Sequence, residues 1–262
     1  MKRRQLFEWA DLPWWLPMFR RLLTDFLQLY VRVIRPYDAY ADRMAAAIAA
    51  TDRVVDLCSG AGGPWPALAE DLRRRTGRAL RVTLTDTAPD PEILQRFAGE
   101  DGVTFHPDPV DARAVPRDLA GARMLFNALH HFPPDEAQAI LQDAVRARQP
   151  VLSFDILRRT VRDLIPMIFA WVHVLLLTPW VRPFSWTRLL LTYVFPVAPI
   201  TIAWEGVVSI LRCYTPEELL AMAASVDGGD TYTWSAGADR KAGLFPVTWL
   251  VGVPAPRALG QS

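Results

Sequence analysis

The sequence predicts an α/β protein built on an open, mostly parallel sheet with helices on both faces. Val54–Pro64 reads as a short apolar strand, a glycine-rich loop and the approach to a helix. Arg81–Asp86 repeats the pattern of an alternating strand that ends in an acid. Further strand-like and helix-like stretches alternate up to Ile156, as expected for a sheet assembled from βαβ units.

The first loop has the composition of a nucleotide site. The strand carries one acid, Asp56, and the glycines that follow it let the backbone approach a ligand at the carboxyl edge of the sheet. An ordinary tight turn between a strand and a helix is the alternative. The residue five places after Gly60 is Trp65, so the dinucleotide spacing Gly-x-Gly-x-x-Gly fails, and no Gly-Lys-Ser/Thr is present. The pattern therefore suits a ligand with ribose, adenine and a charged tail but no phosphate.

These residues resemble the first motif of class I S-adenosylmethionine (SAM)-dependent methyltransferases, Asp/Glu-x-Gly-x-Gly-x-Gly. The chain departs from that motif at Cys58, where a glycine is usual. The resemblance implies a Rossmann-like, seven-stranded methyltransferase sheet with SAM as cofactor. It also implies cofactor contacts from Asp56, Cys58, Ser59, Gly60 and Gly62.

Later segments agree with this resemblance in the expected order. The acid that closes the second strand is placed to bind the ribose hydroxyls. Val110–Pro116 resembles the family's third motif, whose acid faces the adenine amino group. Arg123–Asn127 reads as the fourth strand and runs into Ala128–Phe132, which resembles the motif between methyl donor and acceptor. These matches add the predicted cofactor residues Asp86, Thr87, Asp111, Ala112 and Asn127.

Composition gives information on binding partners and on the cellular compartment. The formal net charge of +1 over 262 residues gives no reason to expect nucleic acid. The two cysteines form no disulfide framework, which indicates a reducing cytosol. Met1–Arg4 is basic, but no long apolar segment with a small-residue cleavage site follows, so no signal peptide is expected.

The first fifty residues are predicted to form cap helices. Apolar residues recur at helical spacing over Pro17–Ile34, and Tyr37–Ala50 reads as a second helix. The first helix suits ordinary packing on the domain. A cap over the active site, or an anchor at a membrane interface, is the alternative that its tryptophan and arginine neighbours allow.

The rest of the chain completes one domain, with residues 1–50 as cap, 51–157 as SAM-binding core, 158–212 as insertion and 213–262 as final elements. Pro134–Arg148 reads as a helix and Pro150–Ile156 as the fifth strand. Thr215–Ser225 begins like a capping box. The final strand pair is predicted at Tyr232–Ser235 and Val247–Val253.

The insertion is too long for a plain connection. Its uncharged runs, Leu164–Val181 and Leu189–Trp204, lie near the lower limit of roughly 17–25 residues for a membrane span. Prolines and His173 within these runs argue against spans. A helical lid over an apolar substrate is favoured, with an interfacial membrane element and a pair of true spans as alternatives.

Three residues are candidates for the chemistry. His130 and His131 follow the fourth strand, and either could act as a general base, although a structural role for both is the alternative. Glu205 is an isolated acid in an apolar neighbourhood, either paired with Arg212 or Arg188 or functional. Asp155 could contact substrate or form a lid salt bridge. No cluster has metal-ligand spacing, so no metal is predicted.

The sequence thus predicts a SAM-dependent methyltransferase. Its acceptor would be a small lipophilic molecule such as an isoprenoid, quinone, polyketide or fatty acid. The methyl group would pass from SAM to this acceptor by an in-line displacement. It is expected in the cytoplasm, with peripheral membrane contact left open. The alternatives are a membrane-associated, non-catalytic protein with a vestigial nucleotide fold, and a nicotinamide-dependent oxidoreductase.

Overall fold

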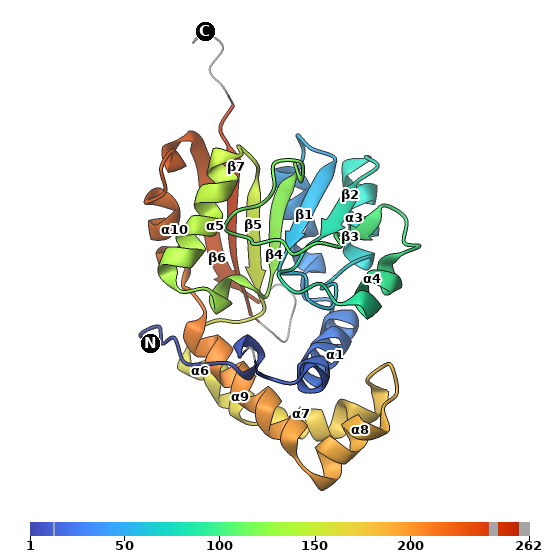
Figure 1. Cartoon of the computed structure of the whole chain (residues 1–262). Helices are drawn as coiled ribbons and strands as arrows, with labels where there is room; N and C mark the ends of the chain where they lie inside the picture. Colours follow the sequence, from blue (N-terminus) through green and yellow to red (C-terminus); the bar gives the residue numbers. More distant parts are fainter. Residues whose placement is uncertain (13, 241–245, 257–262) are drawn as a thin grey trace.

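A single seven-stranded sheet forms the centre of the protein (Figure 1). The structure is a computed structural model that describes residues 1–12, 14–240 and 246–256. The strand order is β3-β2-β1-β4-β5-β7-β6, in which β1 to β5 run parallel and β7 is antiparallel to both β5 and β6. The strands are β1 Arg53–Leu57, β2 Arg81–Leu84, β3 Val103–Phe105, β4 Ala122–Phe126, β5 Val151–Asp155, β6 Tyr232–Asp239 and β7 Val247–Pro254.

Helices cover both faces of this sheet, as predicted. One apolar core lies between the sheet and α2, α3 and α4, and a second lies between the sheet and α5 and α10. Because both faces are covered, the central strands β4 and β5 are buried at every residue. The helices are α1 Pro17–Ile34, α2 Ala41–Ala47, α3 Ala67–Thr76, α4 Pro91–Phe97, α5 Pro134–Arg146 and α10 Pro216–Ala224.

Most predicted elements are present with small shifts. Helix α1 has the predicted bounds, and α10 begins with the predicted capping box between Thr215 and Glu218. The helix predicted at Tyr37–Ala50 is shorter, because a 3₁₀ turn, Asp38–Tyr40, precedes α2. The two final strands are each longer than predicted. Helix α4 and the three-residue edge strand β3 were not predicted from the sequence.

The insertion folds into short helices beyond the edge at which β1, β4 and β5 end (Figure 1). These are α6 Val161–Ile168, α7 Ala170–Leu177, α8 Trp186–Leu189 and α9 Val197–Arg212. Helix α1 lies beside them and contributes Leu22 and Phe26 to a small core that also contains Val174, Val181 and Ala198. Pro196 lies at the break before α9 and accounts for it, since proline removes a helical hydrogen bond, whereas Pro166 lies inside α6.

Within the described ranges, no single helix is long and apolar enough to cross a membrane. Two pairs of consecutive helices, each bent at a short break, are together long and apolar enough for a membrane span. They are Val161–Ile168 with Ala170–Trp180, bent by 43°, and Trp186–Val194 with Val197–Arg212, bent by 80°.

Candidate active site

The glycine loop after β1 has the backbone of a ligand cradle. Gly60, Gly62 and Gly63 all have positive φ, and so does Cys58, at +58°. Cys58 thus adopts the left-handed conformation that the usual glycine would favour, so the departure from the motif is accommodated at that residue. A Cβ on Gly62 would lie 2.3 Å from the Phe97 ring, so the close approach of α4 requires glycine there.

Asp56 is a buried acid at the end of β1. Only 1% of the residue is exposed, and neither carboxylate oxygen has a hydrogen-bond partner among the described residues. Burial raises the pKa of Asp56 to about 7. Ser59 and Trp65 lie close enough to offset part of this rise. In the structure, however, the Ser59 hydroxyl donates to the Asp56 backbone carbonyl, and the Trp65 indole N–H has no partner.

Two further acids lie around the same loop. Asp86 follows β2, and its carboxylate accepts hydrogen bonds from the backbone N–H groups of Gly60 (2.9 Å) and Ala88 (3.0 Å). The Arg113 guanidinium binds both oxygens of Asp111 and lowers its pKa. Burial raises the pKa of the Cys58 thiol, and the charges of Asp86, Asp56 and Asp111 raise it further. The structure therefore brings the three predicted acids around one loop.

The remaining predicted cofactor residues occupy different environments. Thr87 is exposed beside Asp86, whereas Ala112 is buried beside Asp111. Asn127 has a φ of +54°, and its side-chain oxygen accepts a hydrogen bond from the Ile156 N–H at 3.1 Å. This contact ties the end of β4 to the end of β5.

His130 is wholly buried in the 3₁₀ turn Leu129–His131 that follows β4. Its Nδ1 lies 3.0 Å from Oδ1 of Asp155, which ends β5. The Asp155 carboxylate accepts a hydrogen bond from Nδ1–H, which leaves the lone pair on Nε2. Nε2 has no hydrogen-bond partner in the part of the chain that the structure describes. The pair is thus a histidine oriented by a carboxylate, with one free nitrogen.

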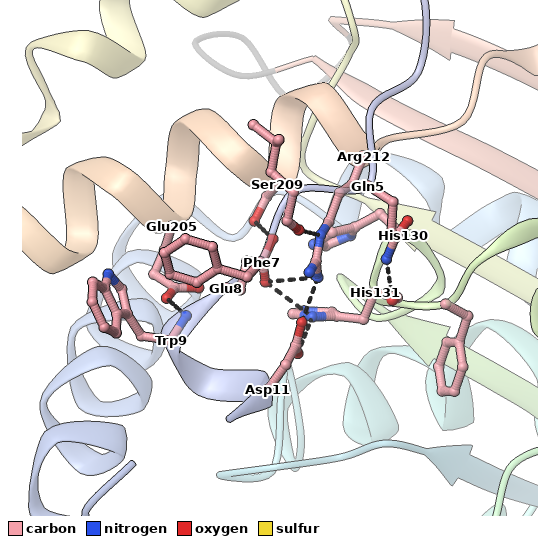
Figure 2. A network of polar contacts seen from close by, with 12 residues as sticks. Gln5, Phe7, Glu8, Trp9, Asp11, His130, His131, Glu205, Ser209 and Arg212 are labelled. Carbon is pink, nitrogen blue, oxygen red and sulfur yellow. Dashed lines mark hydrogen bonds and ion pairs between the residues drawn. The ribbon is translucent and has the colours of Figure 1, made fainter. Parts of the chain in front are cut away.

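His131 belongs to a different cluster, shown in Figure 2. Its Nδ1 lies 3.0 Å from Glu8 Oε2 and 3.2 Å from Asp11 Oδ1, and Arg212 binds Asp11 at 2.6 Å. Burial by itself would lower the pKa of His131, but its hydrogen bonds to Asp11 and Glu8 and their negative charges raise it to about 10. Burial would raise the pKa of Glu8, but His131, His130 and Arg212 lower it to about 2. His131 is therefore protonated at neutral pH.

Residues 3–11, named here the N-terminal strap, lie between α9 and the histidine turn (Figure 2). The Arg4 N–H donates to the Leu211 carbonyl at 3.0 Å, and the Arg3 side chain donates to the carbonyl of Phe132 at 2.9 Å. The backbone N–H of Trp9 donates to Glu205 at 2.6 Å. The strap therefore connects the insertion to the end of β4.

Glu205 lies beside the N-terminal strap. The two arginines that the sequence analysis offered as partners bind other acids, since Arg188 binds Asp25 of α1 and Arg212 binds Asp11 and Glu8. One contact of Glu205 is to the backbone of the strap, since its carboxylate accepts a hydrogen bond from the Trp9 N–H.

The sequence spacing indicated no metal ligands, but folding brings together one group that the spacing could not reveal. Ligand atoms of Glu8, His130 and His131 lie within 4.8 Å of one another. Glu8 and Asp11 already face two cations, His131 and Arg212, and Arg212 Nη1 lies 3.6 Å from Glu8 Oε2. Because these four charges balance, adding a divalent cation would bring unpaired positive charge into the cluster.

Sequence reasoning missed the contribution of the strap to this site. Glu8 is fully buried, and the Ser209 hydroxyl donates to its Oε1 at 2.8 Å. Glu8 and Asp11 lie in a segment rich in tryptophan and proline, and nothing in its local pattern indicates contact with a histidine pair far along the chain.

Comparison with known proteins gives the fold. No protein-family model and no curated protein sequence matches the chain. Human N-acetylserotonin methyltransferase, solved in complex with SAM, is 16% identical, with a TM-score of 0.50 over 90% of this chain and 56% of that one. The CMeT domain of citrinin polyketide synthase is 12% identical, with a TM-score of 0.54 over 95% of this chain and 60% of that one.

A third similar structure is named as a dehydrogenase and not as a methyltransferase. A Rhodobacter sphaeroides protein, provisionally named a Zn-dependent alcohol dehydrogenase, is 13% identical with a TM-score of 0.55, over 96% of this chain and all of that one. The chain spans little more than half of the human methyltransferase. The seven-stranded sheet and its antiparallel β7 give this protein the class I methyltransferase fold.

Proposed function

We propose that this protein is a SAM-dependent methyltransferase acting on a small lipophilic acceptor. The observation that carries the proposal is the loop after β1. There, a left-handed backbone at Cys58 and Gly60 lies beside a buried acid, Asp56, whose oxygens lack partners among the described residues. A buried carboxylate without partners is costly unless a ligand supplies hydrogen bonds.

The residues present fit SAM. Asp86 would bind the ribose hydroxyls, Asp111 and Ala112 would line the adenine, and Asp56 would face the positively charged tail of the ligand. Cys58, Ser59, Gly60, Gly62, Thr87 and Asn127 complete the proposed cofactor site. SAM supplies the methyl group, and the protein's part is to hold acceptor and donor in line.

We assign the general base to His130. Its Nε2 would take the proton from an acceptor hydroxyl or acidic carbon, and Asp155 would act as a positioning residue by holding the proton on Nδ1. His131 suits this role poorly because its raised pKa keeps it protonated. In this proposal His131 and Glu205 instead hold the N-terminal strap, at Glu8 and Trp9.

The strap controls access in this proposal. His130 is fully buried, so an acceptor reaches Nε2 only when the strap moves away from the histidine turn. The surrounding cap and insertion are rich in apolar residues, which favours a lipophilic acceptor. We place the enzyme in the cytoplasm, working as one domain.

The first test is calorimetric titration of the purified protein with S-adenosylhomocysteine. Binding at micromolar concentration, weakened by Asp86→Ala, would support the cofactor site. Screening lipophilic extracts with labelled SAM would then identify the acceptor. Folded protein that fails to bind would refute the proposal and favour the non-catalytic alternative.

The oxidoreductase alternative has its own test. The glycine spacing does not fit the dinucleotide-binding fingerprint. A thermal-shift comparison should show stabilisation by S-adenosylhomocysteine and none by NADH. Stabilisation by NADH alone would reverse the assignment.

A further inference from the structure

The insertion exposes large apolar side chains to an unusual degree. Several of them are more than half exposed, and Trp186 reaches 77%. Monomeric proteins rarely expose large contiguous apolar patches unless the patch binds something. The clearest examples are Ile165, Phe169, Leu176, Trp180, Trp186 and Ile200, named here the apolar surface of the insertion.

The insertion also has a small apolar core of its own, which it shares with α1. Val174 and Ala198 are buried against Leu22 and Phe26 of α1, so the helices are packed on one side. Apart from the exposed His173, helix α7, AWVHVLLL, is apolar on its other sides too, and there Trp171 and Leu176 face solvent. A helix that is apolar all round is normally buried in protein or in lipid. The inner side of α7 is covered by protein, and its outer side requires another partner.

The charges of this segment fit a bilayer surface. Between Leu164 and Trp204 the sequence has no acid, and its charged residues are Arg182 and Arg188. Arg188 is buried and bound to Asp25, whereas Arg182 is exposed. Tryptophan, tyrosine and arginine beside aliphatic residues are typical of the boundary between lipid and water. An exposed cation and no acids complement anionic headgroups.

The shape of the insertion suits a surface contact. The two apolar helix pairs bend by 43° and 80°, so they form short pieces that can lie along an interface. A hollow of about 350 Å³ opens on this side, lined by apolar residues that include Trp171, Ile200 and Trp204. Its lining suits an acyl or prenyl chain.

We propose that the apolar surface of the insertion docks the protein peripherally on a bilayer that contains anionic lipid. Docking would place the carboxyl edge of the sheet, which the insertion adjoins, near molecules dissolved in the membrane (Figure 1). The docking is inferred from the exposed apolar residues, the charges and the bends of the insertion, and it does not rest on the proposed function. Only the idea that the acceptor arrives from the lipid rests on the proposed function.

The test is flotation of the full-length protein with two kinds of vesicle, phosphatidylcholine alone and phosphatidylcholine mixed with phosphatidylglycerol. The wild type should float with the mixed vesicles. The double variant Leu176→Glu, Ile200→Glu should lose at least tenfold in the bound fraction. Arg182→Glu should lose about fivefold, with the mixed vesicles only. The matched control is Leu220→Glu, because Leu220 is an exposed leucine on α10, and it should float like the wild type.

Titration with S-adenosylhomocysteine on the same samples separates this proposal from the proposed function, since each binding event can fail without the other. Two results would overturn the docking proposal. One is a wild type that stays at the bottom of the gradient with both vesicle types. The other is a wild-type dimer that the double glutamate variant dissociates while vesicle binding is unchanged, because the surface would then belong to a second copy of the chain.

Discussion

Helices α5 and α7 are both rich in apolar residues, yet they use them in opposite ways. In α5 the apolar stripe Ala137, Ile140, Leu141, Ala144 and Val145 is buried against the sheet. In α7 only Val174 is buried, although the helix is more apolar throughout. Apolar residues in α5 therefore stabilise the fold, whereas Trp171 and Leu176 of α7 are exposed and remain available for binding. The two helices thus represent two regions of the molecule. The sheet region contains the candidate active site, and the insertion contains the exposed apolar surface.

The largest expected effect lies in the sheet region. Replacing His130 by Gln should lower turnover by about 10²–10⁴-fold, the usual contribution of a general base. Cofactor binding and vesicle flotation should remain at wild-type levels, because the substitution leaves the glycine loop and insertion unchanged. Turnover is measured with labelled SAM once an acceptor is identified.

Asp155→Asn tests the positioning role separately. Its loss of turnover should be accompanied by a changed pH–rate profile, since an amide no longer fixes the proton on His130 Nδ1. A variant that kept the wild-type profile with full turnover would remove the histidine–carboxylate pair from the mechanism.

A pair of leucine substitutions tests the comparison directly. Leu141→Ala in α5 should lower the free energy of unfolding by about 2–5 kcal/mol, because Leu141 is fully buried. Leu176→Ala in α7 should change it by less than about 0.5 kcal/mol, because Leu176 is 62% exposed. Urea denaturation measures both. Equal losses would mean that α7 contributes to the core as α5 does.

Asp86→Ala should weaken binding of S-adenosylhomocysteine. One or two hydrogen bonds to a charged acceptor are removed, each worth about 1.5–3 kcal/mol. The double glutamate variant of the insertion is the control and should keep its cofactor affinity. Unchanged affinity in Asp86→Ala would show that the ribose is bound elsewhere.

The smallest effect concerns the strap and pH. The pKa of His131 is raised to about 10, so the stability it adds is complete below its unfolded pKa of about 6.5 and is lost as pH rises through about 10. The stability from Glu8 is complete above its unfolded pKa and is lost as pH falls through about 2. The difference in unfolding free energy between wild type and His131→Gln should therefore shrink between pH 7 and pH 10. A constant difference would contradict the ion pair.

Local patterns predicted much of the sheet region. The period of apolar residues located α1 with its observed bounds, and the Thr215 capping box located the start of α10. Acids at strand ends located Asp56 and Asp86, because parallel strands end at one edge. The edge strand β3 was missed since three residues are too few to show a period.

The sequence by itself determined the fold class, the glycine loop and the apolar character of the insertion, since these depend on neighbouring residues. Only the tertiary structure decided that Glu8 covers the histidine turn, that Asp155 binds His130, and that the insertion turns apolar side chains outward. Contacts between distant residues, and the side of a mostly apolar helix that faces solvent, depend on how the whole chain packs. Neither property can be recognised from the spacing of apolar residues along the sequence.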